Sequence, residues 1–555
     1  MPNPNLTAKE ATALITLSDS AKDLFRAVYQ SRQKSEKGEE DESNSKIRVN
    51  EIISKMSFFY EKIRNAVDYK EEHLLRKNAI ERILRRLLMT GHAHEPQEMA
   101  KTLIIELIRA GYLANNAVLE EKIGEVAAVI DRFVKLRQLI LAAGKKEKKE
   151  VEGVKKWTIN LMATNIEEML GDHKIDQVIG THMFDIINSN ILDKGNDKEF
   201  SRDKKIQIYI AIYSKLFKYD DYMLEYMLFR YFNSKWNNAT DEDIALAAQH
   251  YNEFRDVVQQ QLNHHFRKQI QKIAARYTVY FSILEEAIAE NPQGTYDKLK
   301  NSAPQFKRLI EKICERRYKE SRGKLRRGAV RSIIYIFLTK IILVFILEVP
   351  AILFLGDQLV YYSLAINVLF PPFLLFLIVM MTSVPGDENT AKIQAGIEQI
   401  VFKEKQESHP VKIEYPRKRK AATMMVFRFF YAVTFILTFG IIIWGLAEIN
   451  FNIVSIIIFL FFLSLISFFG IRLGRFAKTY SVTENKEHFL SFFANFFYVP
   501  VVGAGKWMSE TFSQINVFIF LLDFIIESPF KIFVEVFEQW TAYVKERKDQ
   551  VVDKY

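Results

Sequence analysis

The chain is poor in the residues on which disulfide-stabilised and metal-binding domains depend. Its 555 residues include a single cysteine, Cys314, so no intramolecular disulfide can form. The sequence contains no Gly-rich phosphate-binding loop, no HExxH motif and no paired cysteine ligands. These absences exclude a disulfide framework and argue against the commonest nucleotide and zinc sites.

Histidine pairs are the remaining metal candidates. The segment GHAHE at 91–95 places His92 and His94 two residues apart, but a metal site needs further ligands that are not evident nearby. We expect this pair to lie in an exposed loop between helices. His264 and His265 are predicted in the middle of a helix, where neighbouring side chains point about 100° apart. We therefore expect no bound metal, no cofactor, no catalytic residue and no enzyme activity.

Signals for secretion and nucleic-acid binding are also missing. The N-terminal residues MPNPNLTAKEATALITL lack a charged segment followed by an apolar one, so we expect no cleavable signal peptide. The net charge is +10, from 77 Lys and Arg against 67 Asp and Glu. Basic helices such as RKNAIERILRR, 76–86, carry intervening glutamates, which favours a solvated face. We therefore expect no nucleic-acid partner.

Long apolar runs are present only in the C-terminal half. Four of them approach the roughly 20 residues that a helix needs to cross a bilayer. They are 332–355, 359–383, 423–446 and 453–471. Very short connections, GDQ and AEINFN, join them in pairs. The sequence therefore predicts two transmembrane hairpins.

The distribution of basic residues predicts the orientation of these hairpins. The segment 316–331 carries eight Lys or Arg residues, PRKRK lies at 416–420, and 471–478 adds three more, whereas the short connections carry none. Because Lys and Arg are retained on the cytoplasmic side, both termini are predicted there. The clusters also suit binding of anionic headgroups. We favour a bacterial inner membrane, although an endoplasmic reticulum membrane would give the same pattern.

Two charged residues interrupt the first apolar run. In a straight α-helix, Lys340 and Glu348 lie about 12 Å apart along the axis and about 80° apart around it. One interpretation is that Lys340 extends toward the inner interface and the helix bends or ends near Glu348, before Pro350. The alternative is that both face the bundle interior, with Asn367, Glu448 or Arg428 as partners. Pro371 and Pro372 favour a kink or break in the second span.

The C-terminal region, 479–555, contains no convincing span. Its stretches at 489–502 and 507–527 are predicted to be interfacial or to form a re-entrant pair. Ser528 and Pro529 then start a predicted amphipathic helix at 528–548, lying on the cytoplasmic leaflet. Its aromatic anchors are Phe530, Phe533, Phe537 and Trp540. The alternative is that this apolar face packs against the cytosolic domain.

The fold class predicted from these patterns is all-α. Apolar residues recur at three- and four-residue steps through most of the first 330 residues. Helices are predicted at 201–234 and 304–325, and 241–289 is predicted as a single long helix. Only VKIEY, 411–415, suits a strand. The expected segments are an N-terminal helical arm (1–33), a charged disordered linker (34–47), a cytosolic α-helical domain (48–330), a first transmembrane hairpin (331–383), a cytoplasmic loop (384–422), a second hairpin (423–478) and a membrane-associated C-terminal region (479–555).

Three functional hypotheses follow from this organisation. The first is an integral membrane protein that presents a cytoplasmic α-helical interaction or scaffolding domain to a protein partner. The second is a transport or channel subunit with a polar path through the four spans, carried by Lys340, Glu348, Asn367, Arg428 and Glu448. The third is a protein that senses or shapes the lipid surface. The sequence favours the first because a large cytosolic half without catalytic motifs usually binds a partner.

Overall fold

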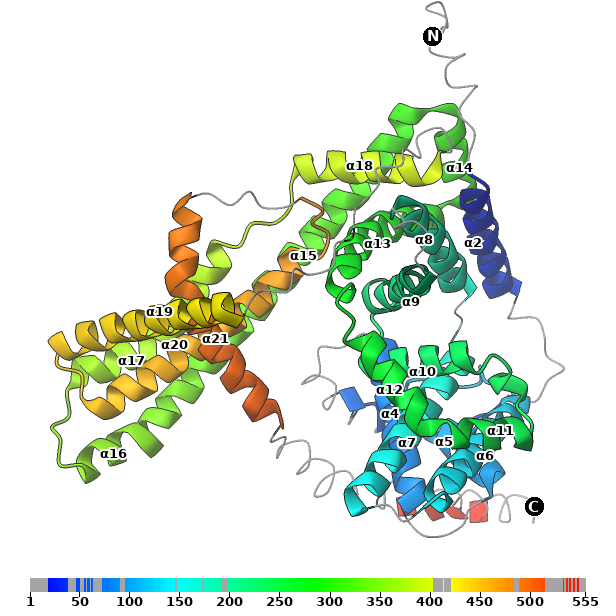
Figure 1. Ribbon diagram of the computed structural model, residues 1–555, viewed down its shortest axis with the longest axis horizontal. Helices are drawn as coiled ribbons and strands as arrows, with labels where there is room; N and C mark the ends of the chain where they lie inside the picture. The colour runs from blue at the N-terminus through cyan, green and yellow to red at the C-terminus, as the bar shows by residue number, and fades with distance from the viewer. Residues whose placement is uncertain are drawn as a thin grey trace, which may run out of the picture. The chain divides into compact units, whose positions relative to one another are not determined.

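The computed structural model describes most of the chain as two compact units (Figure 1). The described residues are 18–37, 46–49, 54–55, 57–59, 61–62, 72–89, 95–144, 147–171, 174–191, 198–402, 413, 421–483, 489–514, 533, 536–537, 539–540, 543–544 and 547–548. The first unit comprises 1–278, 400–415 and 522–555, and the second comprises 279–399 and 416–521.

The fold is all-α, as the sequence predicted. The structure is 85% helical. No β-strand occurs among the described residues, which include an isolated antiparallel bridge between Lys46 and Leu119. Of the strand candidate at 411–415, only Ile413 is described, and it belongs to no regular element.

The first unit is built from short and medium-length helices. They are α2 (Asp19–Lys37), α4 (Glu72–Met89), α5 (Pro96–Arg109), α6 (Glu121–Ala142), α7 (Lys148–Leu170), α8 (Lys174–Asn190), α9 (Lys198–Lys215), α10 (Asp221–Phe232), η1 (Trp236–Asn238), α11 (Asp241–Gln249), α12 (Tyr251–Leu262) and the start of α13 (Arg267–Glu290). Side-chain caps define several starts, as at Asp220 and Thr240, whose oxygens accept from backbone N–H groups three residues later.

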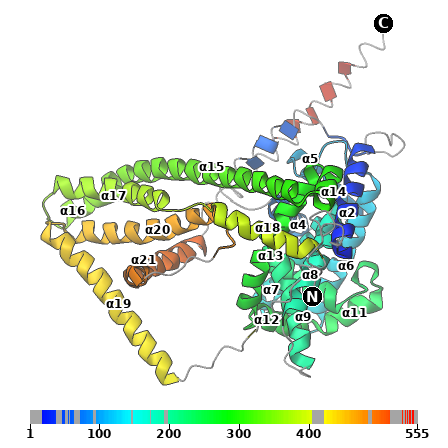
Figure 2. The ribbon, with the colours of Figure 1, turned by 90° about the horizontal axis from the view of Figure 1, so that it is seen from above.

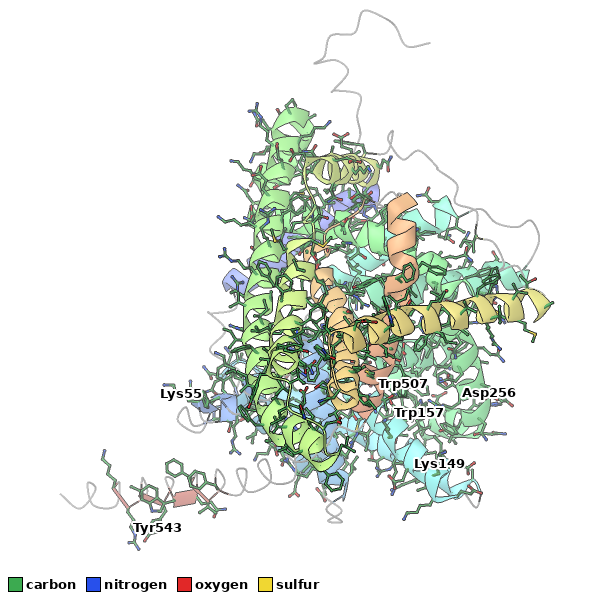
Figure 3. All side chains as sticks on the ribbon, turned by 90° about the vertical axis from the view of Figure 1, so that its left-hand side faces the viewer. Lys55, Lys149, Trp157, Asp256, Trp507 and Tyr543 are labelled. Carbon is green, nitrogen blue, oxygen red and sulfur yellow. The ribbon has the colours of Figure 1, made fainter. Side chains whose placement is uncertain are left out.

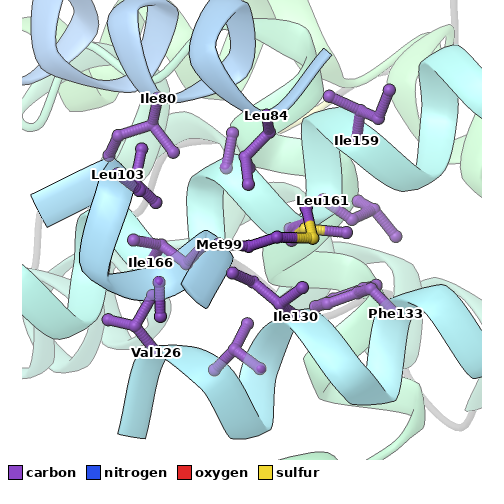
Figure 4. Close-up of a cluster of buried hydrophobic side chains, with 14 of the residues drawn as sticks. Ile80, Leu84, Met99, Leu103, Val126, Ile130, Phe133, Ile159, Leu161 and Ile166 are labelled. Carbon is purple, nitrogen blue, oxygen red and sulfur yellow. The ribbon is translucent and has the colours of Figure 1, made fainter. Parts of the chain in front are cut away.

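The apolar core of this unit lies between α4, α5, α6 and α7 (Figure 4). Aliphatic side chains from these four helices meet there with almost no exposure: Ile80, Leu84, Leu103, Ile130 and Leu161. Burying an aliphatic side chain of this size contributes about 1.5–3 kcal/mol to folding, so this cluster is the main stabilising element of the unit.

Two long predicted helices are divided in the structure. The segment 241–289 breaks at His250 and again at 263–266, giving α11, α12 and α13. The first break lets Tyr251 and Phe254 pack on α7 and α10, with the Tyr251 ring 5.0 Å from Trp157 and the Phe254 ring 5.4 Å from Phe229. The predicted helix at 201–234 likewise divides into α9 and α10. Neither division is marked by Gly or Pro, so tertiary packing overrides helix propensity there.

The second unit contains the longest helix, α15, together with other long helices and several short elements (Figure 2). They are the end of α13, α14 (Pro292–Asn301), α15 (Ala303–Leu343), a π-helical turn η2 (Val344–Glu348), α16 (Val349–Phe354), α17 (Tyr361–Met380), α18 (Asp387–Val401), α19 (Ala421–Glu448), α20 (Ile453–Ala477) and α21 (Phe489–Gln514).

Four of these helices are long and apolar enough to cross a membrane, as predicted. They are Ala303–Phe354, Tyr361–Met380, Ala422–Glu448 and Ile453–Ala477. This pattern supports a membrane protein, because a bilayer interior tolerates only backbones that satisfy their own hydrogen bonds. The first helix joins the basic segment 316–331 and the first span without a break, whereas the sequence predicts a separate helix at 304–325. At 52 residues, it is about 78 Å long.

The spanning helices form a bundle that we call the membrane bundle: residues 332–354 of α15–η2–α16, with α17, α19 and α20. α17 packs against both α15 and α20, while α19 extends away from them (Figures 2 and 3). Gly470 permits the close approach of α20 to α17, since an added Cβ would lie 2.8 Å from Ile378. Apolar clusters fill the contacts between these helices toward both ends of the bundle.

α21 packs across α20 and α19. It is one continuous helix through Pro500, Gly503 and Gly505. The predicted division into separate stretches at 489–502 and 507–527 is therefore wrong as far as Gln514, where the described helix ends. Glycine allows the α20 backbone to approach at this crossing, because a Cβ on Gly505 would lie 1.9 Å from the Ser464 carbonyl oxygen. Residues 515–527 lie outside the described part of the chain.

The predicted C-terminal helix is described only at separate positions. All nine described residues between 533 and 548 are helical. Phe533 and Trp540 are more than half exposed, and the Phe537 ring lies about 6 Å from each of theirs. Phe530 lies outside the described residues. The aromatic side chains therefore share a surface, while their insertion into a membrane stays a prediction.

Candidate intramembrane site

The first span contains a π-helical turn where Pro350 interrupts its hydrogen bonding. Pro350 has no N–H to donate to the carbonyl of Ile346, and its ring would clash with that carbonyl in a regular α-helix. The chain accommodates this by a wider turn at Val344–Glu348 and continues as α16 to Phe354. The sequence predicted that the helix bends or ends near Glu348. It does not end there, and the π turn disturbs it locally.

The π turn changes which residues share a face. A π turn holds one residue more than an α turn. The rotation about the helix axis over the eight steps from Lys340 to Glu348 therefore equals that of about seven α-helical residues, which is nearly two full turns. The two side chains then differ by only about 20° in direction. The buried residues follow a step of four through the turn: Ile336, Lys340, Val344, Glu348 and Ile352. Both charges therefore face the interior of the membrane bundle.

Glu348 is hydrogen-bonded to two neighbouring helices. Its Oε1 accepts from Asn367 Nδ2 on α17 at 2.5 Å and from Ser455 Oγ on α20 at 2.7 Å. Asn367 Nδ2 also lies 3.2 Å from the Ser455 carbonyl oxygen. All three residues are fully buried. The second carboxylate oxygen, Oε2, has no hydrogen-bond partner among the described residues.

Lys340 has a different environment. Its side chain is fully buried, so the interpretation that it extends to the inner interface does not hold. The Nζ atom lies 4.1 Å from the centre of the Phe462 ring on α20, a cation–π geometry. It has no hydrogen-bond partner within the described chain. The ring stabilises the ammonium group while leaving its N–H donors available.

Hydroxyl and amide groups complete what we call the intramembrane polar cluster: Lys340, Glu348, Ser363, Asn367 and Ser455. Each is at most 1% exposed. Ser464 is equally buried but lies on the opposite face of α20, where Gly505 of α21 crosses it. Within the described part of the chain, Ser363 Oγ, Asn367 Oδ1 and Ser464 Oγ have no hydrogen-bond partner. Buried polar groups normally form hydrogen bonds, so several buried groups without a hydrogen-bond partner in one bundle are unusual. The cluster offers both donors and acceptors to a proton or a water molecule.

The predicted polar residues separate into two groups. Lys340, Glu348 and Asn367 face the bundle interior, and the latter two are in direct contact. Arg428 and Glu448, both on α19, are exposed and form no hydrogen bond or ion pair with this cluster in the described chain. They are excluded because α19 packs mainly against α21 rather than against α15 or α17. Pro371 and Pro372 are buried, and α17 continues through both without the predicted break.

Sequence reasoning missed two serines, Ser363 and Ser455, and the aromatic partner of Lys340. Ser363 lies four residues before Asn367 and therefore on the same face of α17, a spacing that could have identified it. Ser455 follows Asn452, whose side chain caps α20 through the Ser455 N–H. No local signal distinguishes Phe462 from the other phenylalanines of α20, since only helix packing places it under Lys340.

The histidine predictions have mixed outcomes. His92 and His94 lie outside the described residues. His264 and His265 lie in the break between α12 and α13 rather than within a helix, and their rings stack at 4.1 Å. Burial lowers the pKa of His182 to about 4, so it is neutral at physiological pH. Among the described residues, no group of three or more metal-ligating side chains occurs.

The first unit carries a separate open cleft of about 900 Å³ between α6, α7, α8, α9 and α10. Aromatic side chains form one wall: Tyr209, Tyr213, Phe217, Tyr219 and Tyr231. Glu168 accepts a hydrogen bond from Arg230 at 2.6 Å. Asn165 also lines the cleft; it is 7% exposed, and its Oδ1 has no partner within the described chain. Burial, and then Glu168, raise the pKa of Tyr213, which keeps its hydroxyl as a donor.

Comparison with known proteins gives no relative for either unit. No protein-family model, no curated protein and no solved structure matches the chain, so the intramembrane polar cluster and the cleft are interpreted from their own chemistry.

Proposed function

We propose that this protein is a membrane transport or channel subunit in which Glu348 takes up and releases a proton. The observation that carries the proposal is the fully buried carboxylate whose Oε1 accepts hydrogen bonds from two other helices, while its Oε2 has no hydrogen-bond partner among the described residues. Ionisable residues inside a membrane are costly, and in known systems they mark proton relays and ion pathways. The proposed role is non-enzymatic.

The surrounding residues have distinct parts in this proposal. Asn367 and Ser455 fix the carboxylate and stabilise its ionised form. Lys340 supplies the opposite charge on the same face of the helix, which reduces the cost of an ionised Glu348 in a medium of low dielectric constant. Ser363 extends the polar surface along α17, one turn from Asn367. A proton suits the site better than a metal cation because few oxygens are available as ligands.

The Glu348→Gln variant tests this proposal. Its amide oxygen can still accept from Asn367 and Ser455, so the fold is expected to be kept, but the side chain no longer exchanges a proton. Purified protein in liposomes, with a potassium gradient and valinomycin, should acidify or alkalinise the lumen as reported by a pH-sensitive dye. We expect flux at the level of empty liposomes for this variant.

The matched control is Glu448→Gln, which removes an exposed carboxylate from α19. It should leave flux unchanged. Equal flux in the wild type and the Glu348→Gln variant, or no flux above empty liposomes in the wild type, would contradict the proposal.

We further propose that both termini lie in the cytoplasm, because the basic segments flank the two hairpins on the side of the termini. Our preferred assignment is the cytoplasm of a bacterium. Cysteines at Asp357 and Asn450, both exposed in the hairpin turns, should react with an impermeant thiol reagent added outside. The native Cys314 is buried, which gives a low background. A cysteine at Lys319, which is exposed, reports on the cytoplasmic side, whereas the nearby Ser321 is buried and unsuitable for labelling. Labelling of a cysteine at Lys319 from outside would reverse the orientation.

A second candidate function is partner binding by the first unit, and the cleft favours it. Its aromatic wall suits a protein segment with apolar side chains, and the Asn165 Oδ1, which accepts no hydrogen bond within the described chain, suits a backbone donor of that segment. A photo-crosslinking amino acid at Tyr231 should give a discrete adduct with a cytoplasmic protein in cells. The same residue at Lys149, an exposed position at the start of α7 (Figure 3), should not. Identical adduct patterns at both positions would remove the support for this function.

A further inference from the structure

The inner end of the membrane bundle carries a small pocket between α15 and the residues that follow α17. It has a volume of about 420 Å³. Its lining combines two arginines, two hydroxyl residues and three aliphatic side chains: Arg322, Leu325, Arg326, Val379, Thr382, Ser383 and Val384. We call it the inner arginine pocket. All of these residues belong to the second unit.

The two arginines of this pocket are unpaired. Arg322 and Arg326 lie four residues apart on α15, so their guanidinium groups share one face and repel each other. Neither has an ion pair among the described residues. Earlier on the same helix, Arg316 and Arg317 both pair with Glu286, each at 2.5 Å. Both side chains are exposed and line the same pocket, so an anion from outside the chain can reach the two of them together.

The depth of the pocket matches that of lipid headgroups. Ser383 ends the apolar run 359–383, and Arg326 precedes the first apolar run by about 9 Å along the helix. The polar layer of a bilayer extends about 5–8 Å beyond each side of its hydrocarbon core. The backbone of Arg326 therefore lies just beyond this layer and that of Arg322 about 6 Å further out. Long arginine side chains can reach the phosphate groups from there, on the side of the bundle that carries the basic clusters.

We propose that the inner arginine pocket binds the phosphodiester of an anionic phospholipid. The forked guanidinium donors of Arg322 and Arg326 match the geometry of phosphate oxygens. The Ser383 hydroxyl, with no partner among the described residues, supplies a further donor. Leu325, Val379 and Val384 provide an apolar wall for the glycerol and upper acyl chain, which a soluble phosphate would not use. The proposal does not depend on proton movement through Glu348.

The test measures lipid retention by native mass spectrometry of the full-length protein in detergent with added phosphatidylglycerol or phosphatidylcholine. We expect the wild type to retain phosphatidylglycerol preferentially. The Arg322→Ala/Arg326→Ala variant should bind it about thirtyfold more weakly, from about 1 kcal/mol for each basic residue near anionic lipid. The matched control is Arg327→Ala/Arg331→Ala, which removes two arginines of the same spacing from positions outside the pocket.

Each outcome decides the proposal. Loss of binding in the pocket variant but not in the control supports it, as does loss in Val384→Phe, which fills the pocket and keeps both charges. Equal loss in the two double variants would overturn it in favour of diffuse charge attraction. Displacement of the lipid by millimolar inorganic phosphate would overturn the lipid assignment in favour of a soluble anion. No preference for phosphatidylglycerol in the wild type would also overturn it.

Discussion

The Asn367→Leu variant is expected to lose about 2–3 kcal/mol of unfolding free energy, because hydrogen bonds to a charged group are worth about 1.5–3 kcal/mol each. Leucine has a similar volume, so the change removes donors rather than packing. Glu348 Oε1 would keep only Ser455 Oγ as a donor. Equilibrium unfolding in mixed micelles, followed by circular dichroism, measures the loss.

Two further variants make this prediction specific. Ser363→Ala, one turn away on the same face of α17, removes a hydroxyl that has no partner in the described chain, so stability should be unchanged or slightly raised. Adding Glu348→Met to Asn367→Leu should recover most of the loss, since replacing both members of a buried polar pair by apolar groups is often neutral. A double variant less stable than Asn367→Leu alone would contradict this account.

The Gly505→Ala variant should disrupt the packing of α21 on α20. The added methyl group would lie 1.9 Å from the Ser464 carbonyl oxygen and 2.6 Å from its carbon. These are backbone atoms, so no side-chain rotation relieves the overlap and the two helices must separate. Overpacking of this kind costs about 1–3 kcal/mol, and more where the backbone has to move. A lower midpoint in the same unfolding assay is the expected result.

Gly440→Ala is the matched control for this change. Gly440 is also within a helix of the bundle, but its added Cβ would meet no atom within 4 Å. Alanine is favoured over glycine in a helix interior by about 1 kcal/mol, so this variant should be as stable as the wild type or more stable. If both substitutions shift the midpoint by the same amount and sign, α21 does not pack on α20 as described.

The predictions that succeeded rest on local patterns. The all-α class followed from the three- and four-residue spacing of apolar side chains, and the four spans followed from the length and composition of their apolar runs. The breaks in 241–289 had no such signal. They arise because Tyr251 and Phe254 contact rings on α7 and α10, residues that are distant in the sequence.

The candidate site shows the same division between local and tertiary information. Lys340, Glu348 and Asn367 were identifiable as polar residues within apolar runs, and Pro350 marked a disturbance in the helix. A straight-helix calculation nevertheless separated Lys340 and Glu348 by about 80°. The π turn closed that separation, and the packing of α17 and α20 supplied Ser455 and Phe462 while leaving Arg428 and Glu448 outside.

The sequence by itself determined that the chain is helical and which segments can cross a bilayer, because a helix satisfies its own backbone hydrogen bonds and membrane insertion depends on apolar length. Only the tertiary structure decided which polar side chains meet. That outcome depends on the rotation of each helix about its axis, which is set jointly by glycine contacts such as Gly470 on Ile378, by the π turn, and by the packing of every neighbouring helix.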